Sequence, residues 1–235
     1  MSCSAILPLL IFSLQVLLPK PAEAQAPELL PEIDTYYVLS PFMRLSFQAK
    51  QTREGGDPTQ AEIGPTIEFY LKPWIKLRNA TRFDLDDANK RALVLSAGYR
   101  ILPSPDIPPT ERMTLIAKTN FSGKWGILIS DRNRADLDWT NGAFDWRYRN
   151  LFSIEKPLTV RRYHPKVFLR SEEFYESRYG KWSTTALYAG GILPIRQHII
   201  VSPYYVHQNN TGNRPNQQLE QVGLIVDIFL GVQKK

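Results

Sequence analysis

Nine residues near the carboxyl end constrain the fold more than any other part of the chain. Every second one is aliphatic, at Val222, Leu224, Val226, Ile228 and Leu230. A period of two places alternate side chains on opposite faces of a β-strand. Segments of this kind, roughly ten residues long and separated by turn residues, recur from Tyr36 onward. The pattern predicts a chain built from β-strands.

We interpret these segments as about twelve strands, with ten as the alternative. An even number would return the carboxyl end to the side of the amino end, as in single-chain bacterial barrels. Between two of the strands, Asn141-Gly142 is a strong signal for a hairpin turn. The predicted strands are Thr35–Leu39, Met43–Gln51, Ala61–Leu71, Trp74–Leu85, Arg91–Leu102, Thr110–Phe121, Trp125–Trp139, Ala143–Glu155, Lys166–Glu176, Trp182–Leu193, Gln197–Gln208 and Gln218–Leu230.

A soluble β-sandwich also alternates apolar and polar residues, so alternation alone does not identify a membrane protein. Three features favour the membrane. The segments are longer than the strands of about 5–6 residues that are usual in globular proteins. Their polar faces carry opposite charges at close spacing. Aromatic residues near the segment ends suit the girdles of a membrane barrel, and we assign that role to Trp74, Trp125, Trp139, Trp146 and Trp182. The predicted fold is all-β, a single antiparallel transmembrane β-barrel.

The amino-terminal segment has the features of an export signal. An apolar stretch from Ala5 to Leu18 precedes the triplet Ala22-Glu23-Ala24, which fits a signal-peptidase site. We expect residues 1–24 to be a cleaved signal peptide, residues 25–34 a periplasmic lead-in, and residues 35–235 the barrel domain. No Lys or Arg precedes the apolar stretch, and a buried helix is the alternative, against which Pro8 and Pro19 argue.

Composition excludes several classes of protein. Of 235 residues 43% are apolar, and outside the amino terminus no run of about 18 apolar residues predicts a membrane-spanning helix. The net charge is +6, but the basic residues are scattered rather than gathered in a patch, which argues against nucleic-acid binding. Cys3, the single cysteine, lies in the predicted signal, so we expect neither disulfides nor a thiolate metal site in the mature chain.

The polar faces of the predicted strands form one charged set, which we assign to the barrel lumen. An isolated charge in a narrow lumen is costly, so these charges should pair across neighbouring strands. One interpretation is a salt-bridged plug that fills the lumen and fixes the strand register. The other is a narrow, charge-lined conduit or ligand pocket. The set is Glu68, Arg112, Arg132, Arg134, Asp136, Asp138, Arg147, Arg149, Arg170 and Glu172.

An enzymatic role has little support in the sequence. A lipid hydrolase of the barrel type needs a Ser activated by a His within hydrogen-bond reach. None of His164, His198 and His207 is followed two residues later by Ser, and the three lack zinc-ligand spacing. We therefore expect no catalytic residues, no metal site and no cofactor.

The order of short motifs resembles a known family. Gly98-Tyr99-Arg100 and Glu111-Arg112 precede the segment from Asp131 to Asp136, and Trp146 to Arg149 and Ser171 to Phe174 follow, before the terminal alternating strand. In this order they resemble the uncharacterised bacterial family catalogued as domain of unknown function 2490. The resemblance covers most of the mature chain and implies an outer-membrane β-barrel with no established activity.

The family's Arg-x-Arg and Glu-Phe positions correspond to Arg132, Arg134, Arg147, Arg149, Glu172 and Phe174. Two departures from the pattern are Asp138, where a further Arg is expected, and a chain that continues for six residues beyond Phe229 instead of ending on an aromatic residue.

The functional hypothesis is an outer-membrane β-barrel of a Gram-negative-type bacterium, either structural or a narrow charge-lined channel. The alternatives are an outer-membrane lipid-modifying enzyme and a soluble periplasmic β-barrel that binds a small ligand. The expected partners are outer-membrane lipid and the barrel-assembly machinery, with no nucleic acid; the sequence does not identify a small-molecule ligand.

Overall fold

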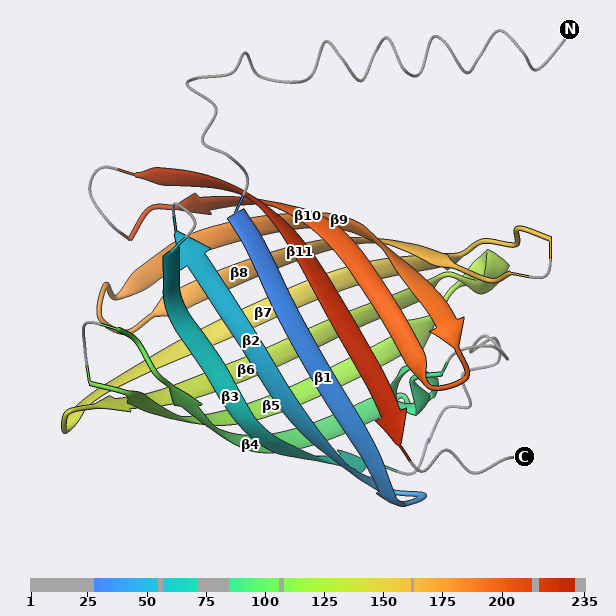
Figure 1. Ribbon diagram of the computed structural model, residues 1–235, viewed down its shortest axis with the longest axis horizontal. Coiled ribbons are helices and arrows are strands. Elements are labelled where there is room, and N and C mark those ends of the chain that lie inside the picture. The colour runs from blue at the N-terminus through green and yellow to red at the C-terminus, as the bar shows by residue number, and fades with distance from the viewer. Residues whose placement is uncertain are drawn as a thin grey trace, which may run out of the picture.

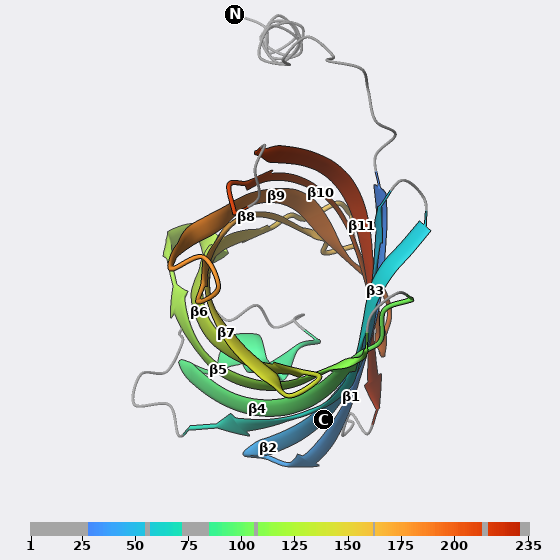
Figure 2. The same ribbon diagram turned by 90° about the vertical axis from the view of Figure 1, so that its left-hand side faces the viewer.

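The computed structural model describes residues 28–54, 57–71, 85–105, 108–161, 163–212 and 216–230. Within these ranges eleven strands close into one barrel (Figures 1 and 2), which confirms the predicted all-β, single-barrel fold. Two short 3₁₀ turns interrupt the connections, η2 (Asp87–Lys90) and η3 (Lys124–Gly126). The strands are β1 (Glu28–Ser40), β2 (Met43–Glu54), β3 (Asp57–Tyr70), β4 (Leu93–Leu102), β5 (Thr110–Ser122), β6 (Leu128–Thr140), β7 (Ala143–Pro157), β8 (Lys166–Glu176), β9 (Lys181–Arg196), β10 (Ile199–Asn210) and β11 (Gln217–Leu230).

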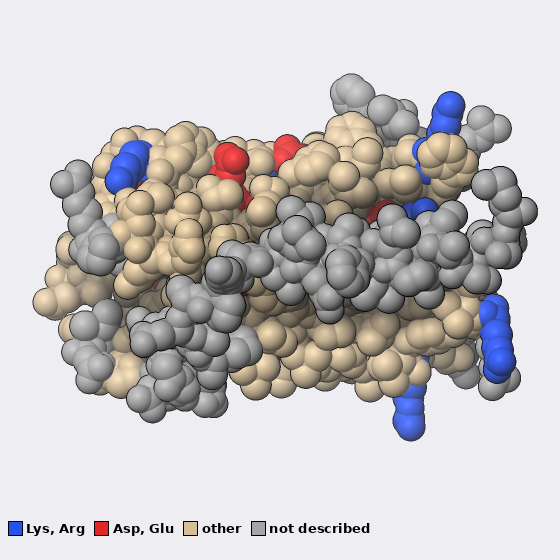
Figure 3. Space-filling model, turned by 90° about the horizontal axis from the view of Figure 1, so that it is seen from above, with Lys and Arg blue, Asp and Glu red and all other residues tan. Residues whose placement is uncertain are grey.

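The wall of the barrel places apolar side chains outside and charged side chains inside. Every strand carries at least one large apolar side chain that is more than a third exposed. The inner face buries charged residues instead, among them Arg44, Arg134, Asp136 and Glu172, each at most 6% exposed. In the view of Figure 3 the outer surface is mostly free of charge, and Lys and Arg lie mainly toward the two ends. This distribution is the reverse of that in a soluble globular protein.

The barrel closes through a parallel pair of strands. β1 pairs with β11 in parallel from Glu28 opposite Gln221 to Tyr37 opposite Leu230, whereas all other neighbouring strands are antiparallel. Each hairpin reverses the chain, so an odd number of strands leaves the first and last strands running in the same direction. β1 therefore starts at one end of the barrel and β11 finishes at the other (Figure 1).

Closure corrects three expectations. The described residues form eleven strands rather than twelve or ten, the sheet is not wholly antiparallel, and the start of β1 and the end of β11 lie at opposite ends of the barrel. Residues 28–34, expected to be lead-in, belong to β1, because they pair in parallel with Gln221–Asp227 of β11 and place Glu32 and Asp34 toward the lumen. The predicted strand Trp74–Leu85 falls almost wholly on residues 72–84 and the signal peptide on residues 1–24, both outside the described residues.

Two strand junctions show how local sequence sets the backbone. Asn141 and Gly142 have φ angles of 48° and 80°, as a tight hairpin turn requires, which confirms the predicted turn. The strand expected from Trp125 begins at Leu128 instead. Trp125 lies in η3 with a φ of 58°, a conformation that breaks the strand.

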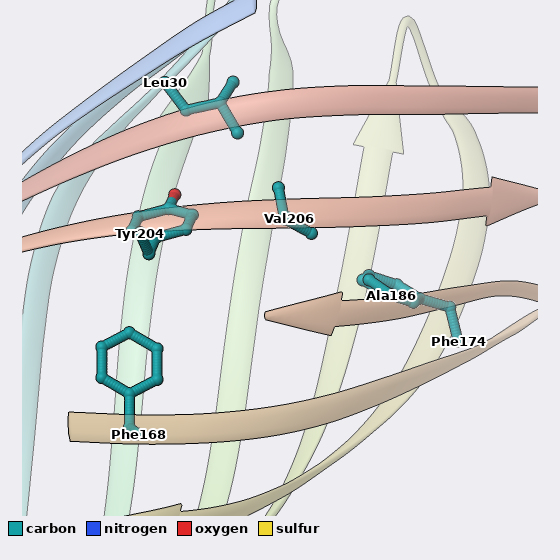
Figure 4. Close-up of a cluster of buried hydrophobic side chains, with 6 residues drawn as sticks. All are labelled: Leu30, Phe168, Phe174, Ala186, Tyr204 and Val206. Atoms are coloured by element: carbon teal, nitrogen blue, oxygen red, sulfur yellow. The ribbon is translucent and has the colours of Figure 1, made fainter. Parts of the chain in front are cut away.

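A small apolar cluster lies inside the barrel, on the side formed by β8 to β11 and β1. Figure 4 shows its side chains converging from four of these strands. It contains Leu30, Phe168, Phe174, Ala186, Tyr204 and Val206. Gly223, opposite Tyr204 in the register, makes room for the aromatic ring. A Cβ at residue 223 would lie 1.9 Å from Cζ of Tyr204.

Among the described residues, no helix is long and apolar enough to cross a membrane.

Gly223→Ala should destabilise the barrel by roughly 1–3 kcal/mol, the usual cost of overpacking. Adding Tyr204→Ala should make the double variant more stable than the sum of the two single effects, because the clash is then absent. The free energy of unfolding, followed by tryptophan fluorescence in denaturant, measures both. Gly191→Ala is the matched control, since the nearest atom to its new Cβ would be 3.7 Å away. Additive effects at residues 223 and 204 would contradict the packing described here.

Candidate functional site in the barrel lumen

All ten charged residues assigned to the lumen from the sequence form ion pairs inside the barrel. Arg112 binds Asp138, Arg132 binds Glu172, and Arg134, Arg147 and Arg149 all approach Asp136. The remaining two pair with residues that we had not singled out, Glu68 with Arg44 and Arg170 with Glu155.

Asp136 is the first centre of this network and is fully buried. Its Oδ1 accepts hydrogen bonds from Nε of Arg134 at 2.6 Å and from Oγ1 of Thr114 at 2.9 Å. Nη2 of Arg149 lies 2.8 Å from Oδ2 but makes no hydrogen bond with it, so that contact is coulombic. Three guanidinium groups thus surround one carboxylate.

Glu62, which is not in the predicted lumen set, is the second centre. Its carboxylate contacts Arg100 at 2.5 Å, Arg134 at 2.9 Å and Arg112 at 3.4 Å. Glu62 has the same strand parity as Glu68, so the alternation rule would have placed it in the lumen. Since Arg134 contacts both centres, the contacts join strands β3 to β7 in one network.

We call this network the arginine layer and define it as Glu62, Arg100, Arg112, Arg134, Asp136, Asp138, Arg147 and Arg149. It holds five guanidinium groups against three carboxylates, and Glu176 adds a further carboxylate at 3.5 Å from Arg147. Buried charges are tolerated only when they are paired, and removing one partner leaves the other uncompensated. The charges of the arginine layer therefore depend on one another, and the loss of one residue would leave its partners unpaired.

A cavity of about 330 Å³ lies between the arginine layer and η2. Arg134, Arg149 and Glu62 contribute to its wall from the layer, and Asp86, Ala88 and Asn89 from the η2 segment. The lining of the cavity mixes cationic and acidic side chains. The cations include Lys50, Lys118, Arg132, Lys166 and Arg170, and the acids include Glu32, Asp34, Glu155, Glu172 and Asp227.

Two carboxylates face each other at the parallel seam. Asp34 and Asp227 are opposite in the β1–β11 register, and the Tyr36 hydroxyl lies 3.4 and 3.3 Å from their oxygens. Oδ1 of Asp34 is buried without a hydrogen-bond partner. The predicted lumen set does not contain this pair, because Asp34 falls in the predicted lead-in and its partner Asp227 lies at the other end of the sequence.

The described residues contain no group of three or more His, Cys, Asp or Glu side chains arranged to hold a metal ion.

Arg44 fastens η2 to the barrel wall. Its guanidinium donates to Glu68 and to Asp86, both at 2.7 Å. Asp86 also caps η2 by accepting a hydrogen bond from the Ala88 amide, and Asn120 donates to the Ala88 carbonyl. Burial alone would raise the pKa of Asp86, but Arg44 and Lys118 outweigh it and lower that pKa from 3.8 to about 2.

The tryptophans assigned to the membrane interface lie in different places. Trp139, Trp146 and Trp182 are on the outer wall close to the β6–β7 and β8–β9 turns, and all are more than a third exposed. Trp146 and Trp182 also contact Tyr175, at ring distances of 5.5 and 5.8 Å. Trp125 lies at the opposite end in η3 and is 84% exposed. Trp74 is outside the described residues.

One histidine has an acidic neighbour. Nδ1 of His207 lies 2.6 Å from Glu220 on the outer wall, where Glu220 also accepts a hydrogen bond from Tyr205. Within the described ranges no Ser or Thr hydroxyl is hydrogen-bonded to His207. The pair therefore lacks the nucleophile that a hydrolase site would require.

The depressed pKa of Asp86 predicts a dependence of stability on pH. Asp86 ionises more readily in the folded protein, so its contribution is present above the unfolded pKa and is lost as pH falls from about 4 to about 2. At neutral pH, Asp86→Asn should cost about 2 kcal/mol, since one pKa unit corresponds to about 1.4 kcal/mol. Denaturant unfolding of both proteins across this range measures the difference. A difference that persists unchanged to about pH 2 would contradict the Arg44–Asp86 clamp.

Comparisons with known proteins identify a family but no function. No curated protein matches the chain. The family model described as "Protein of unknown function (DUF2490)" matches residues 42–219, which include the arginine layer and most of the barrel wall. The match confirms the resemblance drawn from the motifs, and the chain belongs to the DUF2490 family of proteins of unknown function.

Proposed function

We propose that this protein is an integral outer-membrane β-barrel whose lumen is closed by the arginine layer. The observation that carries the proposal is the reversed wall, with exposed apolar side chains on all eleven strands and buried charges inside. A soluble monomer rarely exposes contiguous apolar surface beyond a few hundred Å². In a bilayer the same surface is favourable, and a closed barrel pairs every strand edge.

The aromatic residues support the same placement. Trp139, Trp146, Tyr175 and Trp182 gather on the outer wall near one end of the barrel. Tyr and Trp favour the boundary between hydrocarbon and water, where the ring is apolar and the N–H or O–H can reach water. Their position fits one of the two girdles that flank the apolar band of a membrane barrel.

We further propose that residues 1–24 direct export and that the barrel-assembly machinery inserts the protein. The function we favour is structural, with no catalytic role, because the ion pairs of the arginine layer join β3 to β7 inside the lumen. A narrow charge-lined channel would require these pairs to separate. The cavity above the layer favours a second candidate, a binding site for a small charged ligand.

Membrane integration predicts a specific electrophoretic behaviour. The protein should fractionate with outer membranes, and its band in detergent gels should move when the sample is boiled, because a closed barrel resists detergent until heated. Fractionation with immunodetection, with and without boiling, measures this. A soluble periplasmic band with no shift would overturn the membrane proposal and favour the soluble ligand-binding barrel.

The closed lumen predicts that Arg134→Ala weakens folding. Removing Arg134 takes a cation from both Asp136 and Glu62, and breaking a buried ion pair in this way costs roughly 3–5 kcal/mol. Arg178→Ala is the matched control, because Arg178 is largely exposed and its pair with Glu176 should contribute at most about 1 kcal/mol. Stability is measured as the denaturant concentration at which half of the protein loses the band of the folded, unboiled barrel.

Planar-bilayer conductance separates the structural function from the channel. The wild-type barrel should conduct poorly. An Arg134→Ala barrel that keeps full stability and gains conductance would show that the layer is a gate rather than a structural plug. If neither stability nor conductance changes, the layer has neither role.

A further inference from the structure

A row of polar side chains crosses the apolar outer wall. Each member lies directly opposite the next in the strand register, from Asn133 on β6 to Gln218 on β11. We call it the outer polar row, and it consists of Asn133, Asn150, Glu173, Thr185, Asn209 and Gln218. No sequence motif predicts the outer polar row, because each strand contributes a single residue to it.

The row descends from one rim of the barrel into its wall. Its members follow the hydrogen-bonding direction, and since the strands are tilted to the barrel axis (Figure 1), such a line runs obliquely. Gln218 is near the start of β11, at the rim, whereas Asn133 is inside β6. On β7 the row lies between Trp146 toward the rim and Phe152 away from it, and on β6 between Trp139 toward the rim and Asp131 away from it.

Polar atoms at this position are unexpected if the wall faces lipid, and this inference rests on that proposed function. Ionisable groups facing hydrocarbon are rare, costly and commonly functional. Asp131, next to the row on β6, accepts hydrogen bonds from Asn133 at 3.0 Å and from Asn150 at 2.7 Å. Tyr148 donates to Asn133. These contacts fix the side chains at the end of the row that is farthest from the rim.

Two carboxylates in this region have no cationic partner among the residues that the structure describes. Among the described residues neither Asp131 nor Glu173 forms an ion pair, and Glu173 is exposed. A second copy of the chain would not supply the cation, because a symmetric contact places the same acidic patch on both partners. A purely anionic lipid headgroup would meet two negative charges.

We propose that the outer polar row binds the headgroup of a zwitterionic aminophospholipid. The primary ammonium would pair with Glu173 and Asp131, in charge-assisted hydrogen bonds that gain strength outside bulk water. The amide N–H groups of Asn209 can donate to the phosphate. Trp146, Tyr175 and Trp182 border the row on its rim side, where aromatic faces favour a cation, and Phe152 and Leu187 offer apolar surface to the acyl chains.

Native mass spectrometry of the purified barrel tests the proposal with phosphatidylethanolamine, phosphatidylcholine and phosphatidylglycerol as probes. Phosphatidylcholine keeps the charge and phosphate but lacks ammonium N–H donors. Phosphatidylethanolamine should bind most tightly, and Glu173→Gln with Asp131→Asn should weaken it by roughly tenfold or more, as expected for lost charge-assisted hydrogen bonds. Glu111→Gln, an exposed carboxylate on β5 away from the row, should leave the preference unchanged.

Equal binding of the three lipids, or a preference that survives the double variant, would overturn the proposal. If the wild-type protein forms a dimer without lipid and the double variant is monomeric, the row binds a second copy of the chain and the lipid proposal is wrong. The same preparations are checked for the heat-dependent band shift. A preparation without that shift contradicts the membrane proposal itself, whereas a shifted band without lipid preference contradicts only the lipid site.

Discussion

Closure of the sheet is the constraint on which the rest of the structure depends. An apolar surrounding cannot satisfy backbone N–H and C=O groups, so a wall that faces outward with apolar side chains must leave no strand edge unpaired. Here the last edge is closed by the parallel pairing of β1 with β11. A parallel seam requires an odd number of strands, so the start of β1 and the end of β11 lie at opposite ends of the barrel. The seam also brings Asp34 next to Asp227 inside the lumen.

Charge pairing inside the barrel follows from closure. A buried carboxylate without a partner is costly, so inward carboxylates on β3 and β6 pair with cations from neighbouring strands. Asp136 and Glu62 obtain them from shared arginines, and the planar guanidinium group can contact two acids at once. The arginine layer thereby ties β3 to β7 through side chains as well as through the backbone. The apolar cluster of Phe168, Tyr204 and Val206 fills the other side of the lumen.

Most of the fold could be predicted from strand periodicity, because a local period of two assigns each side chain to the inner or the outer face. It placed all ten chosen charges, from Glu68 to Glu172, where ion pairs form. It failed where the deciding contact is distant in sequence. The parallel seam joins residues nearly two hundred positions apart, and nothing in Glu28–Asp34 alone marks a strand. The outer polar row also depends on register across six strands, which single-strand patterns do not contain.

Side-chain environment along β11 tests the central claim, the reversed wall, most directly. The sequence contains one cysteine, Cys3, so a Cys3→Ser background accepts single spin labels at successive positions from Val222 to Leu230. We predict that labels at 222, 224, 226, 228 and 230 meet oxygen dissolved in lipid, and that labels at 225, 227 and 229 do not; residue 223 is left unlabelled because Tyr204 occupies its side-chain space. Preferential contact of the first set with a water-soluble nickel complex would contradict the account and place this face in water.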